Sequence, residues 1–345
     1  MKRRIVVWIC VLMTLIFSGC QTEDSGAYDR GMEALAAADY DTAMEEFQKA
    51  ANQDGRKAEA YRGEGIIYLR RQDYTHAVTL FSLSLQEMKH ENPEFREDVL
   101  FYQAEAYQGN GQLQEALTLY EELIEGSMPD QAYFMRGRLY LLDGNLTNAE
   151  ADFRMAVEES DRYDIYIWIY EAYESLNMEA DGAAYLEKAL KLTPQNASDY
   201  YQQGRIYYYL EEYDKAKASL NQAIDAGNQE AVLLLGHICV ETGDVSGARS
   251  LYQGYLDKEI RPAAAYNGLA LCDMADGNYD SALANLKKGL QCQDEEENEN
   301  LLYNEIIVYE YKLDFEVAKI KMQEFLEKYP NNQDAIRENK FLQSR

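Results

Sequence analysis

Apolar residues recur along most of the chain at the spacing of an α-helix, and each apolar stretch is followed by a turn and a second such stretch. Residues that end one helix and begin the next mark these turns. Examples are Gly111-Gln112, Gly144-Asn145, Gly243-Asp244 and Gly277-Asn278. The pattern therefore predicts pairs of amphipathic helices joined by tight turns.

The helix pairs form an internal repeat. One copy carries Tyr133, Gly137, Tyr140, Ala149, Phe153 and Ala156. The same spacing recurs at Tyr61, Gly65, Tyr68, Ala77, Phe81 and Ser84, and again at Tyr200, Gly204, Tyr207, Ala216, Leu220 and Ala223. Aligned on these positions, repeats start near residues 24, 58, 97, 130, 163, 197, 229, 263 and 299.

The order aromatic, small, aromatic, then Ala, bulky and small resembles the tetratricopeptide repeat (TPR). This resemblance implies an all-α superhelical solenoid with about nine helix-turn-helix repeats over residues 28–330 and a capping helix over residues 331–345. A single repeat cannot bury its own apolar face, so neighbouring repeats must stack into one continuous core.

Proline placement supports this prediction, because a proline inside a helix costs about 3 kcal/mol. All five prolines (Pro93, Pro129, Pro194, Pro262 and Pro330) fall between predicted repeats. The 29 tyrosines suit a thin solenoid, in which a ring is buried while its hydroxyl reaches water.

Three segments depart from the regular repeat. Residues 89–94 are an insertion, and residues 291–300 hold a run of acids, Asp294–Glu297. We expect both to be loops or lengthened helix ends. In the fifth repeat, Gly182 and Leu186 stand where alanine and an aromatic residue are usual.

The first twenty residues have the form of a secretion signal. The basic residues Lys2, Arg3 and Arg4 precede an apolar run over residues 5–17. As a helix this run would span about 20 Å, which is short of the roughly 30 Å hydrocarbon core of a membrane. We therefore expect a signal peptide over residues 1–19 rather than a membrane-spanning helix.

Ser18, Gly19 and Cys20 follow the apolar run and resemble the lipobox of bacterial lipoproteins, with Phe17 where that family usually has leucine. The resemblance implies a diacylglycerol on the Cys20 sulfur, cleavage after Gly19, and a short tether over residues 20–27. Acyl chains such as palmitate would then anchor the protein in a membrane. The alternatives are an ordinary signal peptide cut nearby or a retained anchor.

Charge and hydropathy exclude two classes of protein. The chain has 61 acidic and 33 basic residues, so its formal charge is -28. This charge argues against a protein that binds nucleic-acid phosphates. A mean hydropathy of -0.51 excludes a protein with many membrane spans. An anionic membrane surface would repel such an acidic protein, so only the lipid on Cys20 would keep the protein at the membrane.

The sequence lacks known catalytic and metal-binding patterns. Its three histidines lie in no zinc-protease motif, and neither a nucleophile elbow nor a phosphate-binding loop occurs. The last three cysteines lack the spacing of a zinc site, and Cys239 and Cys272 are expected to be free, buried thiols. We therefore expect no enzyme activity, no metal and no cofactor.

By resemblance, the first helices of TPR proteins line a concave face that binds partners. Its candidate binding residues here are Arg62, Phe101, Phe134, Arg138, Trp168, Tyr201, Arg205, Tyr208 and His237. Two aromatic-then-arginine pairs are spaced four residues apart and so share a helix face. These arginines would either capture carboxylates of a partner or pair with acids of the same face, such as Glu171. The family's two-carboxylate clamp is not reproduced, because Tyr28 and Met32 occupy the places of its Lys and Asn.

Together these features predict a lipid-anchored, extracytoplasmic scaffold that binds a protein or peptide in a bacterial cell envelope. The protein would be located at the cell membrane, or at the outer membrane in a bacterium that has one. The alternative is a surface lipoprotein that captures glycans or peptides on its aromatic face. Binding of nucleic acid is not expected.

Overall fold

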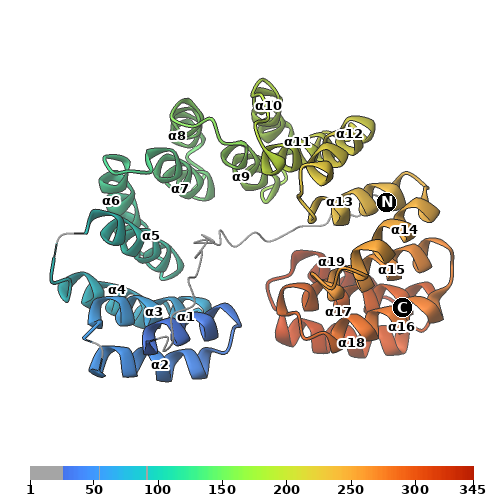
Figure 1. Ribbon diagram of the computed structural model, residues 1–345, viewed down its shortest axis with the longest axis horizontal. Helices are drawn as coiled ribbons and strands as arrows, with labels where there is room; N and C mark the ends of the chain where they lie inside the picture. Colours follow the sequence, from blue (N-terminus) through green and yellow to red (C-terminus); the bar gives the residue numbers. More distant parts are fainter. Residues whose placement is uncertain (1–25, 54, 91) are drawn as a thin grey trace. The chain divides into compact units, whose positions relative to one another are not determined.

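The computed structural model describes residues 26–53, 55–90 and 92–345 (Figure 1). Within these residues the chain forms nineteen α-helices and no strand. None of these helices is long and apolar enough to cross a membrane. The predictions for the signal peptide, the lipidation of Cys20 and most of the tether concern positions outside the described residues.

The helices of the described segments follow one another as nine pairs and a last single helix, which confirms the predicted all-α repeat. The first helices of the pairs are α1 (Ala27–Ala36), α3 (Lys57–Arg70), α5 (Pro93–Gly109), α7 (Pro129–Leu142), α9 (Tyr163–Glu174), α11 (Ala197–Tyr209), α13 (Ala231–Glu241), α15 (Pro262–Ala275) and α17 (Glu295–Tyr311). The second helices are α2 (Tyr40–Gln53), α4 (Tyr74–Gln86), α6 (Leu113–Ile124), α8 (Leu146–Glu158), α10 (Glu179–Ala189), α12 (Tyr213–Asp225), α14 (Val245–Leu256), α16 (Tyr279–Gln291) and α18 (Phe315–Lys328). Helix α19 (Gln333–Leu342) ends the chain's helical part.

The chain divides into two compact units, residues 1–112 and 113–345, and each is described by itself. In the first unit α1 packs on α2, α2 on α3, and α3 on α4. In the second unit successive first helices also contact one another, as α7 with α9, α9 with α11, and α11 with α13. Figure 1 shows these four helices on one side of that stack, with α8, α10 and α12 on the other. We call these the first-helix side and the second-helix side.

The recurring small residues let a large side chain of the second helix enter between first helices. A Cβ atom added at Gly65 would lie 2.7 Å from the Phe81 ring, and Phe81 is fully buried. The Tyr252 ring touches two glycines, Gly236 of its own pair and Gly268 of the next. Large side chains of the second helices therefore fill the space between successive pairs, as in a close-packed protein interior.

In the fifth pair a large residue stands at a first-helix position that is small in most other pairs. Tyr170 occupies the place that a glycine or alanine takes in most other first helices, and Gly182 of α10 lies opposite it. A Cβ atom at Gly182 would lie 3.0 Å from the Tyr170 Cα. Glycine in place of the usual alanine of the second helix thus leaves room for Tyr170.

The insertions and prolines adjust helix starts. Pro93, Pro129 and Pro262 are the first residues of α5, α7 and α15, where the missing N–H costs no hydrogen bond. The acid run begins α17, with the Asp294 side chain accepting a hydrogen bond from the backbone N–H of Glu297 at 3.2 Å. Negative charge is favourable at a helix N-terminus. The acid run is therefore a lengthened helix start rather than a loop.

Candidate functional site

The nine predicted binding residues fall in both units. Arg62 on α3 and Phe101 on α5 belong to the first unit, and the other seven lie on α7, α9, α11 and α13 of the second. The two groups are therefore considered separately.

In the first unit, Arg62 and Phe101 are largely covered. Arg62 is only 5% exposed and Phe101 7%. The Arg62 Nη2 donates a hydrogen bond to the Asp98 Oδ1 at 3.0 Å, and the guanidinium lies 5.3 Å from the centre of the Tyr102 ring. Burial would lower the pKa of Arg62, but its hydrogen bond and ion pair with Asp98 raise it above its ordinary value. This arginine holds α3 to α5 and presents little charge to a partner.

On α7 and α9 the site contains two packed aromatic rings, those of Phe134 and Trp168. Phe134 is 3% exposed and lies under Trp168, with ring centres 5.5 Å apart. The Arg162 guanidinium lies 5.6 Å from the centre of the half-buried Trp168 ring. One turn beyond Phe134, Arg138 is half-buried, and no hydrogen bond or ion pair to its guanidinium occurs among the described residues. Arg138 is therefore available to an outside carboxylate.

On α11 the second predicted arginine is already paired. The Arg205 Nη2 lies 2.9 Å from the Glu171 Oε1, and the Tyr209 hydroxyl donates to the same oxygen at 2.7 Å. The Arg205 Nη1 also donates to Gln202 at 2.9 Å. Burial raises the pKa of Glu171, and the positive charge of Arg205 opposes that rise. Pairing within the face, one of the two alternatives, is thus the outcome at Arg205.

Tyr208 of α11, together with His237 and Glu241 of α13, continues the site. The Tyr208 hydroxyl and the His237 Nε2 are 3.2 Å apart, and the Glu241 Oε1 lies 3.5 Å from the same nitrogen. The tyrosine hydroxyl can donate a hydrogen bond to this nitrogen, and Glu241 lies on its other side. Burial raises the pKa of Tyr208, and Glu241 adds to the rise, so this hydroxyl stays protonated at neutral pH. Tyr201 lies half-buried on the same helix as Tyr208.

Four of these residues occupy the same place in successive first helices. Each directly follows the residue that faces the second helix of its own pair. We call Arg138, Glu171, Arg205 and His237 the charged strip. Because α7, α9, α11 and α13 contact one another in order, the strip runs across the first-helix side of the second unit.

Two contributors to the strip were missed from the sequence, Tyr209 and Glu241. Each lies four residues after a strip member, Arg205 and His237 respectively, and this spacing places two side chains on one helix face. The spacing was therefore the signal that could have identified them.

No group of three or more His, Cys, Asp or Glu side chains among the described residues could hold a metal ion. Cys239 and Cys272 are free and buried, as expected. Burial raises the pKa of Cys272 to about 11, so its reactive thiolate is scarce at neutral pH.

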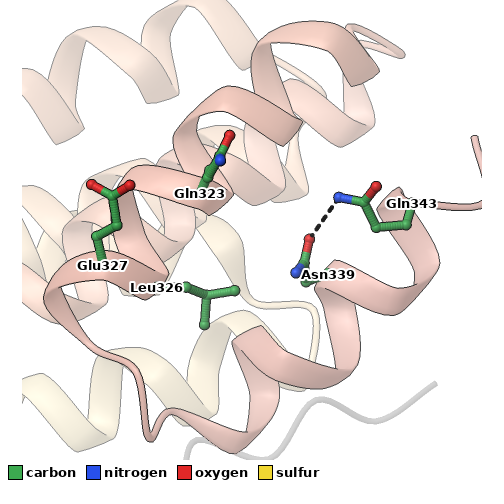
Figure 2. Close-up of a pocket in the computed structure, with 5 residues that line it drawn as sticks. All are labelled: Gln323, Leu326, Glu327, Asn339 and Gln343. Carbon is green, nitrogen blue, oxygen red and sulfur yellow. Dashed lines mark hydrogen bonds between the residues drawn. The ribbon is translucent and has the colours of Figure 1, made fainter.

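The C-terminal helices enclose a depression of ≈ 590 Å³ between α18 and α19. Figure 2 shows its lining, where the Gln343 Nε2 donates to the Asn339 Oδ1 at 3.3 Å. Its other lining residues are Gln323, Leu326 and Glu327. One acid among amides gives this depression no evident chemistry, and none of the predicted site residues lines it.

Comparison with known proteins adds a family match and distant relatives. The model of the family described as "Tetratricopeptide repeat" matches residues 28–89, 102–164 and 201–265. A Drosophila melanogaster protein, the BBSome complex member BBS4 homolog, is 23% identical over 270 residues, which are 77% of this chain. The chain spans about half of that relative, 50% of its length.

Two solved structures have a similar arrangement of helices at low identity. A tetratricopeptide repeat protein from Parabacteroides merdae is 16% identical, with a TM-score of 0.43, and the match covers 83% of this chain and 95% of that one. PilW, a type IV pilus biogenesis factor, is 15% identical, with a TM-score of 0.43, and the match covers 61% and 99% of the two chains.

Proposed function

The chain belongs to the tetratricopeptide repeat family, and from this premise we propose that the charged strip binds an extended segment of a partner protein. Arrays of this family typically act as non-catalytic scaffolds for protein–protein interaction. The observation that carries the proposal is half-buried Arg138, whose guanidinium has no partner among the described residues and which lies one turn from the Phe134–Trp168 contact.

The geometry of the strip suits an extended peptide. Packed helices lie about 8–10 Å apart, and an extended chain rises about 3.3 Å per residue. About every third residue of a bound segment would therefore meet a new first helix. Arg138 would hold a carboxylate of the segment with two parallel hydrogen bonds. The hydroxyls of Tyr208 and Tyr209 would lie along its path.

Side chains at the centre of the strip are already held in place by contacts with one another, and this pre-organisation favours binding of a partner. The contacts among Arg205, Glu171 and Tyr209 fix three side chains before a partner arrives. Less side-chain entropy is then lost on association, since immobilising a long side chain costs about 0.5–1.5 kcal/mol. Arg205 thus acts as a positioned hydrogen-bonding surface, whereas Arg138 supplies the open charge.

The glycan-capture alternative depends on an accessible Trp168 ring. Arg162 lies over this ring and Phe134 packs against it at an interplanar angle of 43°, so both side chains would compete with a sugar for the ring. A titration that follows the fluorescence of Trp168 separates the two functions. We expect no change across a panel of soluble glycans, and a saturable change would favour glycan capture.

We also propose that the protein is lipidated at Cys20 and acts at the extracytoplasmic face of a bacterial membrane as an assembly factor or adaptor. Support comes from the sequence: the three leading bases, the apolar run over residues 5–17, and Gly19 before Cys20. Mass spectrometry of the mature N-terminal peptide should find an acylated cysteine. A Cys20→Ser variant should lose its membrane association. An uncut and unmodified N-terminus would refute this proposal.

Photocross-linking in cells tests the binding surface. A photoreactive phenylalanine analogue at the position of Tyr208 should capture one or a few defined proteins. Arg138→Ala should reduce that adduct, because it removes the open charge. Arg337→Ala is the matched control, because this arginine is exposed on α19, far along the chain from the strip. Equal adduct from both variants would mean that Arg138 does not contact the partner.

A further inference from the structure

A second row of polar side chains lies one helix turn beyond the charged strip. Glu174 of α9, Tyr208 of α11 and Glu241 of α13 each follow a strip member by three or four residues, and this spacing places them on the same helix face as the strip. We call these three residues the second row. Because α11 contacts both α9 and α13, Tyr208 lies between the two acids. Glu174 and Tyr208 are half-buried and Glu241 is exposed, so a ligand on the first-helix side can reach them.

The Tyr208 hydroxyl can accept a further hydrogen bond. Its oxygen lies 3.2 Å from the His237 Nε2. A hydroxyl has one donor and two acceptor lone pairs, so at least one lone pair remains whether the hydroxyl donates to His237 or accepts from it. Three neighbouring rings hold the phenol in place, with centres 5.8 Å (His237), 6.0 Å (Tyr209) and 6.2 Å (Tyr213) from its own. The hydroxyl oxygen is therefore a positioned acceptor.

The charge around this hydroxyl is negative. The Glu241 Oε1 lies 3.5 Å from the His237 Nε2, and that ring adds a positive charge only when it is protonated. Glu174 accepts a hydrogen bond from a tyrosine hydroxyl at 3.3 Å, and a neutral donor leaves the charge of the carboxylate in place. Burial raises the pKa of Tyr208, and Glu241 and Glu174 both add to the rise. A cation at this place would therefore be stabilised from both sides.

We propose that the second row holds a basic side chain of the partner segment whose acidic side chain meets Arg138, a site that rests on the proposed function of the strip. A lysine ammonium group has three N–H donors and no acceptor. It can donate to the Tyr208 oxygen and to the Glu241 carboxylate, and such charge-assisted hydrogen bonds are stronger than neutral ones. The strip's own cation on α11, Arg205, does not take this place, because its guanidinium is bound to Glu171.

The two contacts fix the spacing of acid and base in the partner. Arg138 lies on α7 and Tyr208 on α11, so two helix-to-helix steps of about 8–10 Å each separate them. Six residues of extended chain span about 20 Å. Side chains alternate between the two faces of an extended chain, so an even number of residues brings both to the same face. The partner segment should therefore carry its acidic and basic residues six positions apart.

Calorimetric titration of the full chain with capped nonapeptides tests the charge and the spacing. One probe carries glutamate at its second position and lysine at its eighth, in a background of serine and threonine. The other probe exchanges the two, because either chain direction satisfies the spacing. We expect one of them to bind saturably at low salt. Replacing its lysine by acetyl-lysine should weaken binding about tenfold, because the cation is lost.

Variants of the chain locate the cation. Glu241→Gln should weaken the lysine probe about tenfold, and Glu174→Gln should weaken it less. Neither variant should weaken the acetyl-lysine probe further, because the contact is already absent there. Glu158→Gln is the matched control, because this acid is exposed on α8, on the second-helix side. Circular dichroism checks that each variant keeps its helices.

The outcomes separate this site from the proposed function. Binding that needs the glutamate of the probe and Arg138, but is indifferent to acetylation of the lysine, would overturn the second row and leave the strip intact. If Arg138→Ala leaves lysine-dependent binding unchanged, the proposed function fails while the second row is supported as a site for a basic side chain. Equal effects of Glu241→Gln and Glu158→Gln, or no saturable binding of either probe, would also overturn the second row.

Discussion

Two glycine-to-alanine substitutions in one helix pair should have opposite effects on stability. Gly236 of α13 faces Tyr252, and an added Cβ atom would lie 2.6 Å from the ring Cζ. Gly254 of α14 is exposed and has no atom within 4 Å of an added Cβ. Alanine is favoured over glycine inside a helix by about 0.5–1 kcal/mol. Gly254→Ala should therefore stabilise the protein by about that amount.

At Gly236 the same helical gain is outweighed by a collision. The Tyr252 ring cannot tilt away, because Gly268 touches it as well and its hydroxyl donates to the Leu233 carbonyl at 3.3 Å. Overpacking of a filled core costs about 1–3 kcal/mol. We expect Gly236→Ala to be about 1–3 kcal/mol less stable than Gly254→Ala.

The assay is urea unfolding followed by circular dichroism, with hydrogen exchange of the α13 and α14 amides as a local measure, since repeat arrays need not unfold in one step. A Tyr252→Leu background supplies the control. The atoms nearest to the added Cβ are the far ring atoms, which leucine lacks, so Gly236→Ala should become neutral or stabilising there. A stabilising effect of Gly236→Ala in the native background would refute the close contact.

Three further predictions concern turns, buried charge and thiols. Leu313 has a φ of +60° and is 73% exposed, so Leu313→Gly should raise stability by about 0.5–1 kcal/mol in thermal unfolding, and a loss would contradict the assigned strain. Asp98→Asn should cost about 3 kcal/mol or more in denaturant unfolding, because it leaves the Arg62 charge buried without its counter-ion; a change below about 1 kcal/mol would contradict the buried pair. Alkylation of Cys272, whose pKa burial raises to about 11, should lag behind that of the partly exposed Cys292. Because the folded state binds the Cys272 proton more tightly than the unfolded state does, the contribution of this thiol to stability should fall as the pH rises from about 9 to about 11. The difference in unfolding free energy between the native protein and Cys272→Ala should therefore change over this range, and a difference that is independent of pH would refute the raised pKa.

The sequence was sufficient for the helix pairs because each pair is specified locally. Helical spacing, turn residues and proline placement all act within one repeat, and small residues such as Gly65 and Gly236 indicate close approach. The contact between Tyr170 and Gly182, with glycine where alanine is usual, was visible only as an irregularity. Its meaning depends on two side chains in different helices facing each other, which spacing alone does not specify.

The site was less predictable because its properties depend on contacts between repeats. Arg62 and Arg138 both looked like open cations in the sequence. Only the structure pairs Arg62 with Asp98, 36 residues further on. The concavity between α8 and α10, lined by Tyr173 and Tyr185, had no signal in the sequence, because these tyrosines matched the expected core pattern.

Local charges, rather than the net charge of the chain, decide whether the strip prefers an acidic or a basic group of a partner. The formal charge of -28 would by itself favour basic partners. At physiological ionic strength, however, exposed charges are screened beyond about 8 Å, so the many acids along the repeats act on a ligand at Arg138 only weakly. Glu171, the nearest acid in the strip, is already bound by Arg205 and Tyr209. The open guanidinium of Arg138 therefore decides the local preference, and it favours a carboxylate on an otherwise acidic protein.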